Sequence, residues 1–199
     1  MFNDKYGLTQ AVLNGRKTQT RRIAYMPNGF IIFDDKDFQL KKLDNGRALL
    51  TLCNNRFKTA NYKIGDTIAI AQRYEDMAKD DDLFRLCSKK GILLGRIIFE
   101  KGFHNKMFVR ADLMPHHIRI TNIRVERLQD ISEEDCLKEG IWRDDNVGLE
   151  GTTYWYYGLA NSSFRTAKEA YAALIDKISG KGTWESNPWV FVYDFELVK

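Results

Sequence analysis

Apolar positions spaced three and four residues apart predict three short helices, over residues 8–15, 132–140 and 166–180. Each of these stretches ends on a glycine, which readily adopts the left-handed conformation that follows many helices. The second begins with Ser132 and a run of acidic residues, and the third begins with Thr166 and a glutamate three positions later. Both starts therefore carry the residues of a helix N-cap.

Alternation of apolar and polar positions predicts a larger number of strands. Residues 30–52 have the pattern of a β-meander with a tight turn at Asn45 and Gly46. Further strands are predicted over residues 67–71, 92–99, 118–125 and 189–197. The alternation in residues 118–125 changes phase at Thr121, which predicts a bulge and a bent strand. Many short strands with three helices predict an α+β fold around a small, mostly antiparallel β-barrel.

Length and composition favour one compact domain without disulfides. The chain has 199 residues, of which 44% are hydrophobic, and it contains no internal repeat or low-complexity tract. We therefore expect a single domain over residues 1–199. No apolar run approaches the length of a membrane span, and the three widely spaced cysteines favour a reducing cytoplasm. The formal net charge of +4 permits a polyanionic partner without requiring one.

Common catalytic motifs are missing from the sequence, including a phosphate-binding loop, a dinucleotide fingerprint, a nucleophile elbow and a metalloprotease helix. His116 and His117 are adjacent, so on a strand they would point to opposite faces, and neither a metal site nor a cofactor is predicted. Cys136 lies among acidic residues, which raise the pKa of a thiol. A cysteine nucleophile is therefore not expected.

A dense polar segment follows the first predicted helix, over residues 15–22. It combines four cations and two threonines, namely Arg16, Lys17, Thr18, Thr20, Arg21 and Arg22. One interpretation is structural, because basic residues complement the dipole at a helix C-terminus and polar alternation suits a solvated edge strand. The other interpretation is a functional site in which these cations and hydroxyls act together.

The segment 13–22 resembles the opening motif of the ASCH superfamily, and residues 62–66, 131–140 and 187–196 resemble three further blocks of that family. The larger arrangement is similar to the phage and prophage branch. The resemblance implies a PUA-like β-barrel and an association with RNA. Relative to compact members, the chain is expected to carry insertions near residues 27–61 and 141–165.

Some compact bacterial members of this superfamily are amidohydrolases that remove the acetyl group of N4-acetylcytidine with a lysine, a threonine and a glutamate. By motif position, the resemblance assigns these roles to Lys17 as the base, Thr20 as the nucleophile and Glu139 as the acid and base. In one straight strand, Lys17 and Thr20 would face opposite sides, so the site requires a turn between them. The alternative for Glu139 is a solvated residue in the last turn of its helix.

Four aromatic residues lie together in residues 154–157, which are predicted to form a loop. Such rings can stack on unpaired bases, although they can equally pack over the core. We therefore consider Tyr154 and Trp155, with Arg16, Arg21 and Arg22, as candidate ligand-binding residues.

Three functions follow from these observations. The first is a domain that binds RNA, single-stranded nucleic acid or a modified nucleoside. The second is an amidohydrolase that acts on an N4-acylated cytidine. The third is a phage-associated accessory protein that acts through protein contacts.

Overall fold

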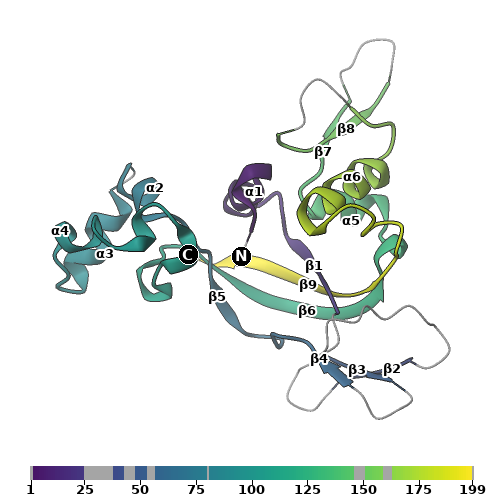
Figure 1. The fold of residues 1–199 in the computed structure, drawn as a ribbon, viewed down its shortest axis with the longest axis horizontal. Coiled ribbons are helices and arrows are strands. Elements are labelled where there is room, and N and C mark those ends of the chain that lie inside the picture. Colours follow the sequence, from purple (N-terminus) through teal and green to yellow (C-terminus); the bar gives the residue numbers. More distant parts are fainter. Residues whose placement is uncertain are drawn as a thin grey trace. The chain divides into compact units, whose positions relative to one another are not determined.

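The structure is a computed structural model that describes residues 2–24, 38–42, 48–52, 57–79, 81–145, 151–158 and 163–198. The described helices are α1 (Leu8–Leu13), α2 (Tyr74–Lys79), α3 (Asp82–Lys89), α4 (Leu94–Ile97), α5 (Glu133–Lys138) and α6 (Ala167–Ser179) (Figure 1). The described strands are β1 (Gln19–Ile23), β2 (Phe38–Lys42), β3 (Ala48–Leu52), β4 (Phe57–Thr59), β5 (Thr67–Ala69), β6 (His117–Arg127), β7 (Trp142–Asp144), β8 (Thr153–Trp155) and β9 (Trp189–Val198).

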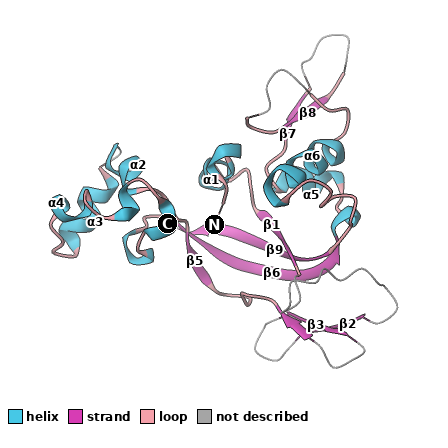
Figure 2. Cartoon of the chain, in the orientation of Figure 1, coloured by secondary structure: helices cyan, strands magenta, loops and turns pink. Residues whose placement is uncertain are grey.

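The strands form three sheets, with the orders β1-β9-β6-β5, β2-β3-β4 and β7-β8 (Figure 2). Strand β1 is an edge strand that pairs with β9 in an antiparallel register, in which Thr20 lies opposite Tyr193 and Arg21 lies opposite Val192. The α+β class predicted from the sequence is confirmed, and the antiparallel sheet is curled into a half-barrel.

The chain divides into two compact units, one formed by residues 1–2, 67–118 and 197–199 and the other by residues 3–66 and 119–196. The first unit has a core of its own, which includes Tyr74, Met77, Leu83, Ile97 and Leu113. Most of its described residues belong to helices and short turns.

The strand predicted over residues 92–99 is wrong, because this stretch contains helix α4. Its continuous apolar character suggested a strand buried on both faces. In the structure, Ile97 alone in this stretch is fully buried, and Phe99 is 86% exposed. The continuous apolar sequence of residues 92–99 therefore does not indicate a strand that is buried on both faces.

The second unit contains most of the predicted elements. The helices predicted at residues 8–15, 132–140 and 166–180 are α1, α5 and α6, and the strands predicted at residues 118–125 and 189–197 are β6 and β9. The predicted caps form: Ser132 Oγ accepts a hydrogen bond from the Asp135 amide at 3.1 Å, and Thr166 Oγ1 accepts one from the Glu169 amide at 3.1 Å. Strands β2 and β3 match the expected meander, whereas residues 30–33 and the turn at Asn45 and Gly46 lie outside the described residues.

Strand β9 occupies the centre of the second unit, between β1 and β6. The sequence pattern predicts burial of one face only, yet Val190 and Val192 are buried as well as Phe191 and Tyr193. Both faces of this part of β9 are therefore covered, which the sequence pattern did not indicate. Among the described residues, no helix has the length and apolar character needed to cross a membrane.

Candidate functional site

The chain turns sharply between α1 and β1, as the predicted site requires. Gly15 has a φ of +71°, and the Lys17 amide donates to the Ala11 carbonyl at 2.9 Å. The Thr18 amide then donates to the Lys138 carbonyl at 3.0 Å, which attaches the segment to the end of α5. Strand β1 begins only at Gln19, so Lys17 precedes the strand.

Lys17 is a buried cation of this segment, with 2% of its surface exposed. Its ammonium nitrogen Nζ donates to Glu139 Oε2 at 2.6 Å, to the Glu139 carbonyl at 2.8 Å and to the Gln19 carbonyl at 2.7 Å. The Gln19 carbonyl can accept this bond because β1 is an edge strand. All three ammonium protons therefore have partners.

Glu139 follows α5 directly and is 5% exposed, so it is not the solvated residue of the alternative interpretation. Its approach to Lys17 depends on Gly140, which has a φ of +107°. A Cβ atom at Gly140 would lie 3.3 Å from Leu8 Cδ2 and 3.7 Å from Lys17 Cδ. Only a glycine allows the end of α5 to pack this closely against α1 and the lysine stem.

Arg21 lies on the same face of β1 as Gln19 and has a fully buried side chain. Its Nη1 donates to Glu139 Oε1 at 3.1 Å, and its Nη2 donates to Glu126 Oε1 at 2.6 Å and to Asp135 Oδ2 at 3.2 Å. The sequence predicts Arg21 as a ligand-binding residue. In the structure its guanidinium is enclosed by carboxylates and does not face solvent.

The charged network continues across the sheet through Arg124. This residue pairs with Asp135, with Asp194 Oδ2 at 3.0 Å and with Glu126 Oε2 at 3.0 Å. The network thus combines four cations with five carboxylates, namely Lys17, Arg21, Arg124, Lys138, Glu126, Glu134, Asp135, Glu139 and Asp194. It carries no positive excess.

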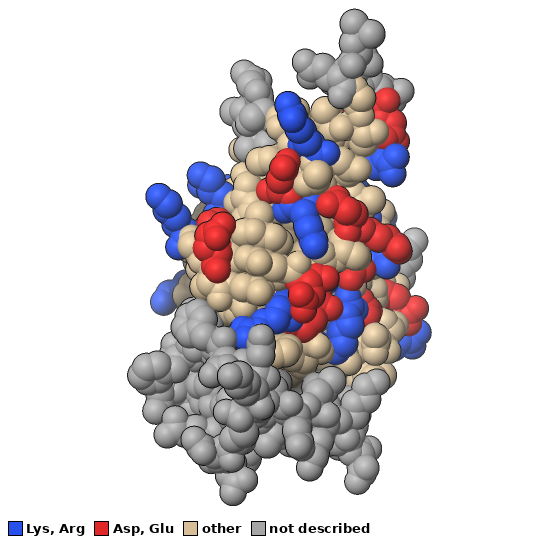
Figure 3. Space-filling model, turned by 90° about the vertical axis from the view of Figure 1, so that its right-hand side faces the viewer, with Lys and Arg blue, Asp and Glu red and all other residues tan. Residues whose placement is uncertain are grey.

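The visible surface of the molecule also lacks an excess of basic residues in one place (Figure 3). Basic and acidic side chains are interspersed over the face shown in Figure 3, and the visible part of that face has no continuous basic patch. The sequence analysis did not identify Arg124 or its carboxylate partners as part of the site. The available signal was the placement of Arg124 and Glu126 two residues apart, on one face of a strand.

Burial sets the protonation behaviour of the site. Burial lowers the pKa of Lys17 below its ordinary value of 10.5, and the adjacent Glu139 opposes this effect only in part. Arg22 and Arg21 lower the pKa of Lys17 further through charge repulsion. Burial also raises the pKa of Tyr171, which lies near Glu139 and Arg21, so its phenol stays protonated. A lysine whose pKa is lowered and which contacts a carboxylate is a candidate proton-transfer pair.

Thr20 and Arg22 project from the other face of β1. The side chains of Gln19 and Arg21 are buried and bonded to each other, so the alternation of a strand directs Thr20 and Arg22 the opposite way. Within the described part of the chain, the half-buried Thr20 hydroxyl has no hydrogen-bond partner. The structure therefore brings Lys17 and Glu139 into contact but does not bond Thr20 to either of them.

Residues 153–155 form strand β8, so the loop predicted at residues 154–157 is partly wrong. β8 pairs with β7, which supplies a cross-strand partner for Trp155 in Trp142. Tyr154 points to the opposite face, opposite Arg143, while Tyr156 is buried and Tyr157 is exposed. Tyr154 and Trp155 were both predicted as ligand-binding residues, and of these two Trp155 stacks on another indole ring, that of Trp142.

Metal and thiol chemistry find no support in the part of the chain that the structure describes. No group of three or more metal-ligating side chains occurs among the described residues. Burial raises the pKa of Cys136 to about 12, and nearby Glu133 adds to this effect. Cys136 is therefore a protonated core thiol, as the sequence analysis expects.

Comparison with protein-family models, with curated proteins and with solved structures gives no match. The chemistry of the site is therefore argued from its own geometry.

Proposed function

We propose that the chain is an ASCH-type protein with a PUA-like barrel and that it hydrolyses the amide of an N4-acylated cytidine. The proposal rests on the direct contact between Lys17 Nζ and Glu139 Oε2, 2.6 Å apart and buried. These are two of the three positions to which the resemblance gives catalytic roles. They lie 122 residues apart in the sequence, so no local pattern brings them together.

Proton transfer within the contact turns Lys17 into a base and Glu139 into an acid. During the reaction a proton passes from Lys17 Nζ to Glu139 Oε2, which leaves a neutral amine and a carboxylic acid. Burial lowers the pKa of Lys17 and so favours the loss of this proton. The amine then leaves its Glu139 and Gln19 partners and moves to Thr20, which projects from the other face of β1, and it removes the hydroxyl proton while Thr20 Oγ1 attacks the acyl carbonyl carbon. Arg22, on the same face as Thr20, stabilises the oxyanion that forms.

Collapse of this intermediate breaks the C–N bond, and Glu139 gives its proton to the departing N4 nitrogen. The products at this stage are cytidine, an acyl ester on Thr20, a Lys17 ammonium and a Glu139 carboxylate. Water then attacks the ester and gives one proton to Glu139, and the Thr20 oxygen recovers its proton from Lys17. The acid is released, and return of the proton from Glu139 to Lys17 restores the ion pair.

The experiment is a turnover assay with the full chain and N4-acetylcytidine, in which cytidine and acetate are quantified by chromatography. We expect Thr20→Ala to abolish turnover because it removes the nucleophile. Thr18→Ala is the matched control, because Thr18 is also half-buried and lies two residues away. Absence of cytidine with the unmodified chain, or equal rates for Thr20→Ala and Thr18→Ala, would contradict the proposal.

A second candidate is a domain that binds RNA, single-stranded nucleic acid or a modified nucleoside without catalysis. It is favoured by the three hydrogen bonds that fix the Lys17 ammonium, because a saturated ammonium serves well as a structural group. Carboxylates outnumber cations in the network, so it does not attract a polyanion, and a nucleic acid would contact the segment through Arg22 on the other face of β1.

The second candidate is tested by fluorescence anisotropy with a labelled single-stranded RNA at increasing salt concentrations. Binding through phosphates predicts a slope of log affinity against log salt of about −0.7 for each phosphate contacted. Arg22→Ala should reduce that slope, whereas Arg119→Ala, on an exposed residue of β6 that pairs with Glu196, should not. Affinity that is insensitive to salt and to Arg22→Ala would rule out phosphate recognition by this segment.

A further inference from the structure

The β7–β8 pair carries two stacked indole rings. Trp142 and Trp155 are cross-strand partners, their ring centroids lie 5.0 Å apart, and their planes differ by 3°. The Arg16 guanidinium lies 4.0 Å from the centroid of the Trp142 ring. Three flat groups from two distant parts of the sequence therefore lie against one another.

This stack remains accessible to solvent. Trp142 is 37% exposed, and Trp155 is half-buried. Each strand of the pair has only three residues, and an isolated hairpin of this size is marginally stable, so the ring contacts help to hold it. An exposed, flat indole surface is the feature that proteins use to stack the bases of unpaired nucleotides.

Arg16 joins the stack to the buried pair. Its Nη1 donates to the Gly140 carbonyl, and Arg16 and Gly140 are the immediate sequence neighbours of Lys17 and Glu139. A ring stacked on the indoles is thus held beside residues that adjoin both members of the proton-transfer pair. The network beside it holds more carboxylates than cations, so it does not favour an anionic ligand.

We infer that Trp142, Trp155 and Arg16 form a stacking platform for the pyrimidine base of a nucleoside. The choice of this ligand rests on the proposed function, whereas the platform itself is argued from the ring geometry. Trp142 lies outside the residues predicted from the sequence. Tyr154, on the opposite face of the pair, is not part of the platform.

The test is binding of N4-acetylcytidine and of cytidine, followed by quenching of tryptophan fluorescence, with ribose as the ligand that lacks a base. Stacking contributes enough that its loss lowers affinity about 5- to 150-fold. We expect this loss in Trp142→Ala and in Trp155→Ala, and a smaller loss in Trp142→Phe, which keeps a flat ring. Arg16→Lys keeps the charge but removes the planar group, so it should also weaken binding.

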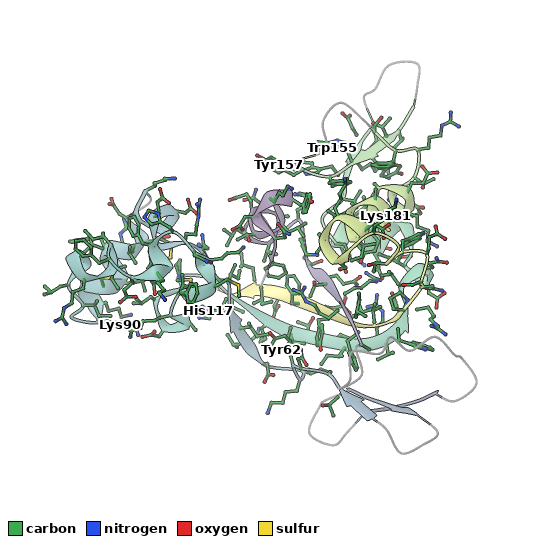
Figure 4. The ribbon with its side chains drawn as sticks, in the orientation of Figure 1. Tyr62, Lys90, His117, Trp155, Tyr157 and Lys181 are labelled. Carbon is green, nitrogen blue, oxygen red and sulfur yellow. The ribbon has the colours of Figure 1, made fainter. Side chains whose placement is uncertain are left out.

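Tyr157→Ala is the matched control, because Tyr157 is an exposed aromatic residue near the end of β8 that is not in the stack (Figure 4). Near-ultraviolet circular dichroism of each variant shows whether the fold is kept. Equal affinity of Trp142→Ala, Trp142→Phe and the unmodified chain would overturn the platform. So would ribose binding as well as cytidine.

The platform and the proposed hydrolysis can fail separately. Cytidine that quenches fluorescence and loses affinity in Trp142→Ala, without any turnover of N4-acetylcytidine, supports the platform and contradicts the hydrolysis. Turnover with the same KM in Trp142→Ala as in the unmodified chain supports the hydrolysis and overturns the platform. A rise in KM with little change in kcat supports both.

Discussion

Removal of one member of the buried pair should destabilise the protein strongly. Lys17→Met leaves the Glu139 carboxylate with Arg21 as its remaining cation, 3.1 Å away. Glu139→Gln leaves the Lys17 ammonium with two carbonyl groups and an amide oxygen. Loss of one partner of a buried pair costs about 3–5 kcal/mol of the free energy of unfolding. Because Arg21 still compensates Glu139, Lys17→Met should lie near 3 kcal/mol, at the lower end of that range.

The double variant Lys17→Met with Glu139→Gln should cost less than the sum of the two single variants. Neither an unpaired charge nor its counterion then remains, and groups in direct contact have coupling energies of about 0.5–3 kcal/mol. The cost of Glu139→Gln should also depend on pH. With its counterion removed, Lys17 has an even lower pKa when folded, so the unfolded chain binds more protons and stability rises with pH up to about 10.4.

The assay is urea unfolding followed by circular dichroism, with the m-value checked for constancy among the variants. The control is the pair of Arg119 and Glu196, which are exposed and whose Nε and Oε1 atoms lie 2.7 Å apart. Their substitution to Met and Gln should change stability by about 0.5 kcal/mol or less. Single variants of the buried pair that cost no more than this control, or that add without coupling, would refute the reasoning.

Three further predictions concern the surroundings of the pair. Burial alone would raise the pKa of Asp135, but Arg124 and its other cationic partners outweigh it and hold the pKa below 3.8. Its stabilising contribution is therefore present above about pH 3.9 and lost as the pH falls through the lower folded pKa, so Asp135→Asn should flatten the acid branch of stability measured by urea unfolding. Gly140→Ala should destabilise the fold by about 1 kcal/mol or more and shift thermal unfolding downward, because φ is positive and the Cβ would crowd Leu8. Cys136 should resist thiol reagents until the chain unfolds, and rapid labelling of the folded protein would contradict its burial.

Local patterns predicted the elements of the second unit better than those of the first. The extents of β9 and α6 follow from alternation and from a helix cap, which act over a few residues. Helices α2 and α3 were not predicted. Their signal was the spacing of the buried positions, with Tyr74 three residues from Met77 and Leu83 four residues from Cys87.

The candidate site could be predicted only through the resemblance of its motifs. Spacing identified a basic segment, but it could not show that Arg21 would be enclosed by carboxylates more than 100 residues away in the sequence. The same limit applies to Trp142, which becomes part of a stack only because β7 pairs with β8. Charge compensation and ring stacking are tertiary properties, so a single sequence read locally does not reveal them.

The charge balance around Lys17 also bears on why the pair is present. A buried ion pair is weak evidence for stability, since apolar residues of similar volume often replace such pairs without loss. A lysine whose pKa is lowered by burial, in direct contact with a carboxylate, has in contrast a clear use in proton transfer. The surrounding cations are neutralised by acidic partners, so the same site offers little attraction to phosphates. We therefore propose that the buried pair serves proton transfer to an uncharged substrate.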